Sequence, residues 1–143
     1  MKQHIICLLT ALSFMFIAGC ESDYNKIEDE WRMAAIINRE FLSRYRTNDL
    51  KIVIESLYNT LYEYHQLEKT HNLWFDYEEI YGIHTCRLGF AYEKLGNKII
   101  AEEYFNEALQ HFSNSSNECI TNIVQMTNAV HNFDSLWNPL WIQ

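Results

Sequence analysis

The residues able to do chemistry in this chain are few and widely spread. His65, Glu68 and His71 form a group at intervals of three residues, which on a helix spreads the side chains over about 120° of its surface. A carboxylate-bridged metal site would need a second Glu-x-x-His motif on a facing helix, and the sequence contains none. His-Glu-x-x-His, Cys-x-x-Cys, a glycine-rich phosphate loop and Gly-x-Ser-x-Gly are also missing. We therefore expect neither an enzyme nor a protein with a metal or cofactor.

The remaining reactive group of interest is the thiol of Cys20. Lys2 gives the chain a positive start, residues 5–17 are almost entirely apolar, and Ala18 and Gly19 are small. This pattern is typical of a secretory signal peptide and is too short for a lasting membrane span. Residues 17–20, Ile-Ala-Gly-Cys, resemble the bacterial lipobox. The resemblance implies that diacylglycerol is attached to the sulfur of Cys20 and that cleavage leaves Cys20 as the first residue. An ordinary secreted protein or an N-terminal anchor helix is the alternative.

This assignment divides the chain into a signal peptide at 1–19, a lipidated tether at 20–26 and a helical domain at 27–143. One acyl chain holds a protein only marginally at a bilayer, so a lasting anchor needs two or three chains. Glu21 stands where an aspartate often marks retention in the inner membrane of Gram-negative bacteria. The resemblance then implies an envelope protein, anchored by lipid in the outer membrane and facing the periplasm.

Composition limits the partners. Loss of Lys2 with the signal peptide leaves 10 basic and 19 acidic residues in 124, a net charge of −9. Such a charge disfavours nucleic acid and anionic lipid surfaces as partners. One proline and four glycines in the whole chain allow long uninterrupted helices.

The apolar residues follow helical spacing throughout, and the sequence predicts an all-α fold of about five antiparallel helices. We expect the first helix to be capped by Asn25 and the fourth by Asn97, after a third helix that ends at Gly96. Ser115 and Glu118 form the capping-box pattern of a fifth helix. The expected helices cover about 26–45, 50–69, 73–95, 97–112 and 115–131.

Residues 82–115 resemble a tetratricopeptide repeat, a helix–turn–helix unit of 34 residues. The matching positions are Leu88, Gly89, Tyr92, Ala101, Phe105 and Ala108, whereas Thr85 and Ser113 depart from the pattern. Small residues allow two helices to cross closely and the larger ones fill the space between them. The resemblance implies one such helix pair followed by a capping helix with a solvated outer face.

The family usually binds peptides or helices on a concave surface lined by the first helix of each repeat. Carried over to this chain, the groove positions are Ile83, Cys86, Phe90, Glu93 and Lys94. Phe90 is the expected apolar anchor, because aromatic residues dominate binding hot spots. Alternatively, a neighbouring helix covers Phe90, which is then part of the core. The aromatic tail with Phe133, Trp137 and Trp141 is either a second binding surface or folds back into the groove.

Cys86 and Cys119 are the thiols left in the domain once Cys7 is removed and Cys20 is lipidated. In an oxidising compartment they could form a disulfide, provided that their Cα atoms come within about 7 Å. If Cys119 lies on a fifth helix that packs against the expected third helix, which carries Cys86, the two cysteines are one residue away from facing each other. The alternative is two buried thiols that behave as small apolar residues.

The predicted function is that of a lipid-anchored adaptor or assembly factor. Small helical lipoproteins of this size and layout act as pilot factors for envelope machines, and this chain is similar to them. Its partners would be the membrane, through lipid, and another envelope protein or peptide. The alternative function is an immunity or exclusion lipoprotein that neutralises a toxin or a phage component.

Overall fold

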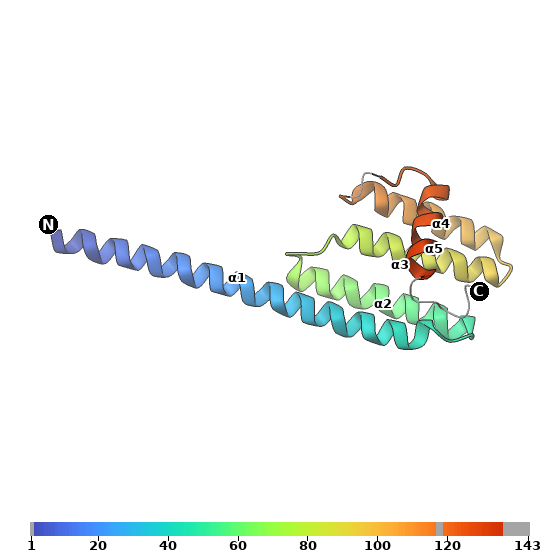
Figure 1. The fold of residues 1–143 in the computed structure, drawn as a ribbon, viewed down its shortest axis with the longest axis horizontal. Coiled ribbons are helices and arrows are strands. Elements are labelled where there is room, and N and C mark those ends of the chain that lie inside the picture. Colours follow the sequence, from blue (N-terminus) through green and yellow to red (C-terminus); the bar gives the residue numbers. More distant parts are fainter. Residues whose placement is uncertain (1, 117–118, 136–143) are drawn as a thin grey trace.

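The computed structural model describes residues 2–116 and 119–135, and this part of the chain is all-α, as predicted (Figure 1). Five helices follow one another without a strand among these residues. They are α1 (Lys2–Tyr45), α2 (Leu50–His71), α3 (Tyr77–Lys94), α4 (Lys98–Asn114) and α5 (Ile123–Ser135).

Helices α1 and α2 form an antiparallel hairpin in which α1 is twice as long as its partner, with 44 residues against 22. The expected start near Lys26 is wrong, because Asn25 lies inside a helix that already begins at Lys2. The helix therefore continues through the segments assigned to the leader and the tether, and its N-terminal half projects beyond the domain (Figure 1). Within the described residues, none of the helices has the length and hydropathy needed to cross a bilayer.

Polar caps set the starts of the three middle helices. Asp49 accepts hydrogen bonds from the backbone N–H groups of Lys51 and Ile52 at the start of α2. Asp76 does the same for Glu79 in α3, and Asn97 for Ile100 in α4. These side chains satisfy N–H groups that have no partner within the helix.

The tight turn between α3 and α4 depends on Gly96. Its φ of +81° lies in the left-handed region, which side chains with a Cβ disfavour. The N–H of Gly96 bonds to the carbonyl of Glu93, and the N–H of Asn97 bonds to that of Tyr92. This is the Schellman arrangement that ends helices at a glycine. It brings α4 back along α3, as the sequence predicts.

Small residues allow α3 and α4 to pack closely. The aromatic rings of Phe105 and Phe112 lie directly over Gly89 and Gly82, so that a Cβ at position 89 would come within 2.5 Å of the Phe105 ring. Ala101 and Ala108 are both buried at the same interface. Helices α3 and α4 therefore pack closely along this interface.

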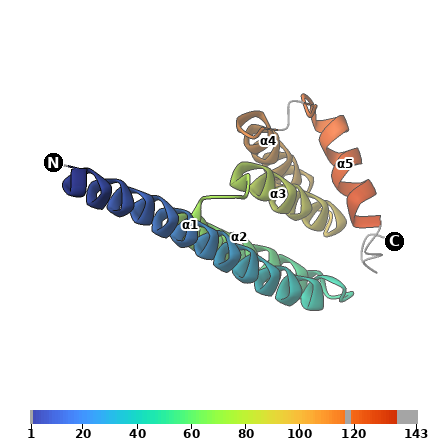
Figure 2. The ribbon, with the colours of Figure 1, turned by 60° about the vertical axis from the view of Figure 1, so that its left-hand side comes forward.

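Helix α5 starts later than expected. Ser115 ends α4 instead of capping α5: its N–H bonds to the carbonyl of His111, and its hydroxyl donates to that of Phe112. The residue that precedes α5 is Asn122, whose side-chain oxygen accepts from the N–H of Gln125. From there α5 packs on α3 and α4 through Met126 and Val130 (Figure 2).

Candidate functional site

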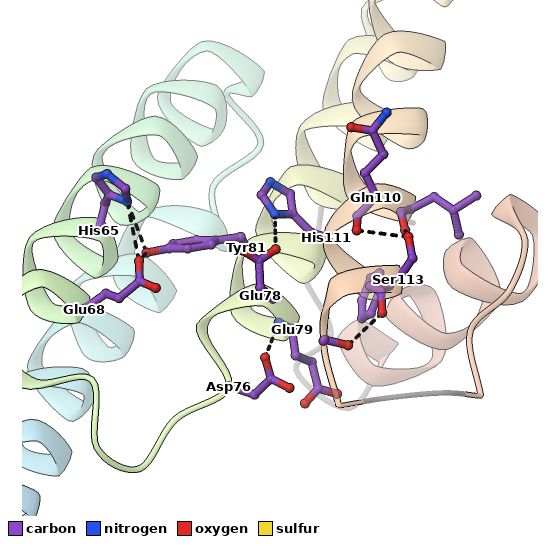
Figure 3. Close-up of polar contacts among 12 residues, drawn as sticks. His65, Glu68, Asp76, Glu78, Glu79, Tyr81, Gln110, His111 and Ser113 are labelled. Carbon is purple, nitrogen blue, oxygen red and sulfur yellow. Dashed lines mark hydrogen bonds and ion pairs between the residues drawn. The ribbon is translucent and has the colours of Figure 1, made fainter.

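The histidines and carboxylates that could do chemistry form a polar row across α2, α3 and α4 (Figure 3). The hydroxyl of Tyr81 donates to Glu68 Oε2 at 2.6 Å, and His65 Nδ1 lies 3.3 Å from the same hydroxyl oxygen. His71 is not part of this group, since its Nδ1 lies 2.8 Å from the hydroxyl of Thr70. Burial, followed by the hydrogen bond to Glu68, raises the pKa of Tyr81, which therefore keeps its proton.

The row continues towards α4, where His111 Nδ1 lies 2.8 Å from Glu78 Oε2. Next to it, Asp76 accepts from both the N–H and the hydroxyl of Ser116 at 2.6 Å, which ties the start of α3 to the end of α4. In the part of the chain that the structure describes, no three His, Cys, Asp or Glu residues come together as metal ligands. These contacts therefore connect α2, α3 and α4 to one another.

A buried ion pair joins α3 to α5. Arg87 Nη2 lies 2.5 Å from Asp134 Oδ1, and the two side chains are 5% and 0% exposed. The Nε of Arg87 also donates to Asp134 at 3.1 Å. From α1, the hydroxyl of Tyr45 donates to Asp134 Oδ2 at 2.6 Å. The carboxylate of Asp134 therefore connects three helices at one point.

Aromatic side chains surround the guanidinium of Arg87. Its carbon lies 5.0 Å from the ring centre of Phe41, 5.2 Å from that of Tyr45 and 5.8 Å from that of Phe133. His84 Nδ1 lies 3.3 Å from Arg87 Nη1. Burial and, to a lesser extent, the charge of Arg87 lower the pKa of His84 well below its usual value, so His84 is neutral and accepts this hydrogen bond.

A groove opens next to this cluster, on the side where α1, α3 and α5 face one another; we call it the inner groove. Its volume is about 310 Å³, and its surface is mainly apolar. Its lining residues are Asn38, Phe41, Leu42, Tyr64, Phe75, Ile80, Ile83, His84, Arg87 and Phe133. Since Arg87 is already paired with Asp134, the groove offers apolar contact and not a free charge. A cavity of this size and lining suits an apolar anchor side chain from a peptide or helix.

The predicted groove positions do not stay together in the structure. Ile83 lines the inner groove. Phe90 does not, because its ring packs on Phe105 of α4 at 5.4 Å and on His131 of α5 at 6.4 Å. Phe90 thus belongs to the packing between helices, the alternative that the sequence left open. Glu93 and Lys94 are exposed at the end of α3, outside the lining.

Cys86 and Cys119 do not form a disulfide with each other. Cys86 is completely buried among Ala101, Phe105 and Met126. Cys119 is exposed and precedes α5, so it does not lie on a helix beside Cys86, as the disulfide hypothesis requires. Burial raises the pKa of the Cys86 thiol to about 12. Trp137 and Trp141 of the aromatic tail lie outside the described residues, while Phe133 lines the inner groove.

Glu30 is a structural residue that the sequence did not reveal. It is fully buried on α1 and accepts hydrogen bonds from the backbone N–H groups of Leu73 and Trp74. The hydroxyl of Tyr77 also donates to it, at 2.6 Å. Glu30 therefore fixes the α2–α3 loop against α1. The sequence did contain one indication of this role: Glu30 lies four residues before Ala34, on the buried face of the helix, where a carboxylate needs hydrogen-bond donors.

Comparisons of the chain with models of protein families, with curated proteins and with solved structures give no match.

Proposed function

We propose that this protein is a lipid-anchored envelope protein that binds another protein or peptide and holds it at a membrane, as an adaptor or assembly factor. Attachment would be through lipid on the sulfur of Cys20, which follows the signal-like segment at 1–19. With Glu21 next to the anchor, the proposed location is the outer membrane, facing the periplasm.

The inner groove is the observation that carries the binding part of the proposal. Apolar residues of α1 and α3, among them Leu42, Ile80 and Ile83, line a cavity of about 310 Å³ in a fold made of helices. The tetratricopeptide resemblance of residues 82–115 supports the same role, because that family binds partners with the inner surface of its helix pairs. The polar contacts of the described residues support helix packing, so binding accounts for this surface better than catalysis does.

The test is cross-linking in intact cells with substitutions inside and outside the groove. Ile83→Arg places a charge in the inner groove and is expected to remove the cross-linked partner from the membrane fraction. Ile99→Arg makes the same change at a position that is 74% exposed on α4 and should leave the partner unaffected. Equal cross-linking by both variants would contradict the proposal. Specific capture of a toxin or phage component would instead support an immunity or exclusion role.

A further inference from the structure

The two ends of the helical stack differ in how they are covered. At the α3–α4 end, α5 packs over Cys86, Phe105 and their neighbours. At the other end, the α1–α2 hairpin contacts α3 on one side, and no further helix of the described chain packs on its opposite side (Figure 2). We call this uncovered side the outer face. Repeat proteins usually give such a terminal face a polar surface, because a stacking surface left open is apolar.

The outer face carries exposed apolar side chains from both helices of the hairpin. Met33 and Ile36 of α1 are 47% and 38% exposed, and Tyr62 of α2 is 66% exposed. Met33 and Ile36 line a cavity of about 440 Å³ whose other walls include Ile37 and Leu67. Tyr62 lines a cavity of about 250 Å³ on the same hairpin. Glu40 and Glu63 line both cavities, so the two form one continuous groove along the hairpin.

This groove opens on a different side of α1 from the inner groove, although Phe41 lines both. On α1, the residues that line the inner groove include Asn38 and Leu42, whereas Ile36 and Glu40 line the outer one. Positions two residues apart on a helix differ by about 200°, so these two sets face nearly opposite directions. A partner on the outer face would therefore approach the hairpin from the side opposite the inner groove, and Phe41 is the lining residue common to both.

The charge of the outer groove selects among possible occupants. Glu40 comes from α1 and Glu63 from α2, and Arg44 is the basic residue of the lining. Burial and the charge of Glu40 raise the pKa of Glu63, while Arg44 acts against this rise. The two carboxylates therefore repel each other, and a cation between them would be favourable. A second copy of the chain, related by a two-fold axis, would bring two more glutamates against a single additional arginine, Arg44, and this excess of negative charge disfavours it.

We propose that the outer face of the α1–α2 hairpin is a docking site for a basic amphipathic helix of another protein. Apolar residues at a spacing of three and four along that helix would pack on Met33, Ile36 and Tyr62, as helices do in apolar grooves. A lysine or arginine of the same helix would lie between Glu40 and Glu63. This site rests on neither the lipid anchor nor the inner groove, so it can fail or hold independently of the proposed function.

The test uses the full chain in a neutral detergent and a labelled amphipathic helical peptide of leucine and lysine, with binding followed by fluorescence anisotropy. A peptide with glutamate in place of lysine should not bind. The double variant Glu40→Gln/Glu63→Gln should weaken binding about fivefold to tenfold, the effect of losing two partly exposed ion pairs. Glu102→Gln/Glu103→Gln removes the same charge from exposed positions on α4 and should leave the affinity unchanged.

A second pair of variants tests the apolar contact. Ile36→Ser should weaken binding, whereas Ile99→Ser should not, and hydrogen exchange should show protection by the peptide along α1 and α2. The proposal is overturned if the two peptides bind alike, or if the control pair Glu102→Gln/Glu103→Gln weakens binding as much as the outer-groove pair. Sedimentation of the chain as a dimer that Ile36→Ser dissociates would also overturn it, since the occupant would then be a second copy.

Discussion

Arg87 and Asp134 form a buried ion pair between α3 and α5, with Nη2 and Oδ1 separated by 2.5 Å. The two residues are 47 positions apart in the sequence, and both side chains are almost inaccessible to solvent. Tyr45 adds α1 to the same carboxylate. Phe41 of α1, Arg87 of α3 and Phe133 of α5 also line the inner groove. The contacts of Asp134 therefore hold together the three helices that carry these lining residues.

Asp134→Asn is expected to destabilise the fold strongly. It leaves the charge of Arg87 buried without its counter-charge, which typically costs about 3–5 kcal/mol of unfolding free energy. Urea denaturation measures the change. Asp29→Asn breaks an ion pair with Arg32 in which both side chains are more than half exposed, and should cost less than about 1 kcal/mol. Equal losses in the two variants would show that Arg87 and Asp134 are not paired in a buried site.

Glu30→Ala should free the α2–α3 loop. The substitution removes the acceptor of the Leu73 and Trp74 N–H groups and of the Tyr77 hydroxyl, with an expected loss of about 2–3 kcal/mol for bonds to a charged group. Hydrogen exchange at the amides of Leu73 and Trp74 should become much faster. Glu28→Ala changes an exposed carboxylate two positions away and is the control. Unchanged exchange in the Glu30 variant would rule out this role of the carboxylate.

Acid should destabilise the protein through His84. Its pKa in the folded protein is lowered well below 6.5 by burial and by Arg87, so the unfolded chain takes up the proton first as the pH falls. The stability is therefore complete above about pH 6.5 and decreases below it, by at most about 1.4 kcal/mol per pH unit for one group. Denaturant titrations at several pH values should show a shallower slope for His84→Gln. His131→Gln, at an exposed position, should keep the original slope.

The two cysteines of the domain should differ sharply in reactivity. Thiolate is the reactive form, and the thiol of Cys86 is fully buried with its pKa raised to about 12, whereas Cys119 is exposed. Iodoacetamide at mildly alkaline pH should label Cys119 in the native protein, whereas Cys86 should be labelled only after denaturation. Peptide mass spectrometry distinguishes the two sites. A peptide pair linked through Cys86 and Cys119, from protein prepared without reductant, would restore the disulfide hypothesis.

Gly89→Ala should weaken the α3–α4 pair. The new methyl group would come within 2.5 Å of the Phe105 ring, and such overpacking typically costs about 1–3 kcal/mol. Replacing Phe105 by leucine removes the ring edge, so the double variant should lose less stability than the sum of the single ones. Additive losses in this cycle would mean that the two residues do not touch.

The sequence was sufficient for the fold class and for most helix ends, because these depend on local signals. Hydrophobic spacing, the turn at Gly96 and the cap at Asn97 act within a few residues, and the structure has them where they were expected. The start of α5 was misplaced because two capping signals compete in the same loop. Ser115 ends α4, and Asn122 takes the cap position of α5.

The residues that shape the candidate site were harder to predict, since they depend on contacts between distant helices. Nothing near Arg87 in the sequence indicates that Asp134 is its partner. Phe90 is of a residue type common in binding hot spots, but its ring packs against Phe105 of α4 and His131 of α5 and is partly buried there. The outer face could not be predicted from the sequence, because Met33 and Ile36 look like ordinary apolar helix residues. Whether such a residue is buried or exposed depends on whether another helix packs against it.

The lipid anchor at Cys20 is tested most directly by the intact mass of the protein extracted from the membranes of its own cells. We predict a chain that begins at Cys20 and carries the additional mass of diacylglycerol, with or without an N-acyl group. A Cys20→Ala variant should be recovered without that mass and with its leader uncleaved. Wild-type protein that retains residues 1–19, or that starts elsewhere and carries no lipid, would contradict the account.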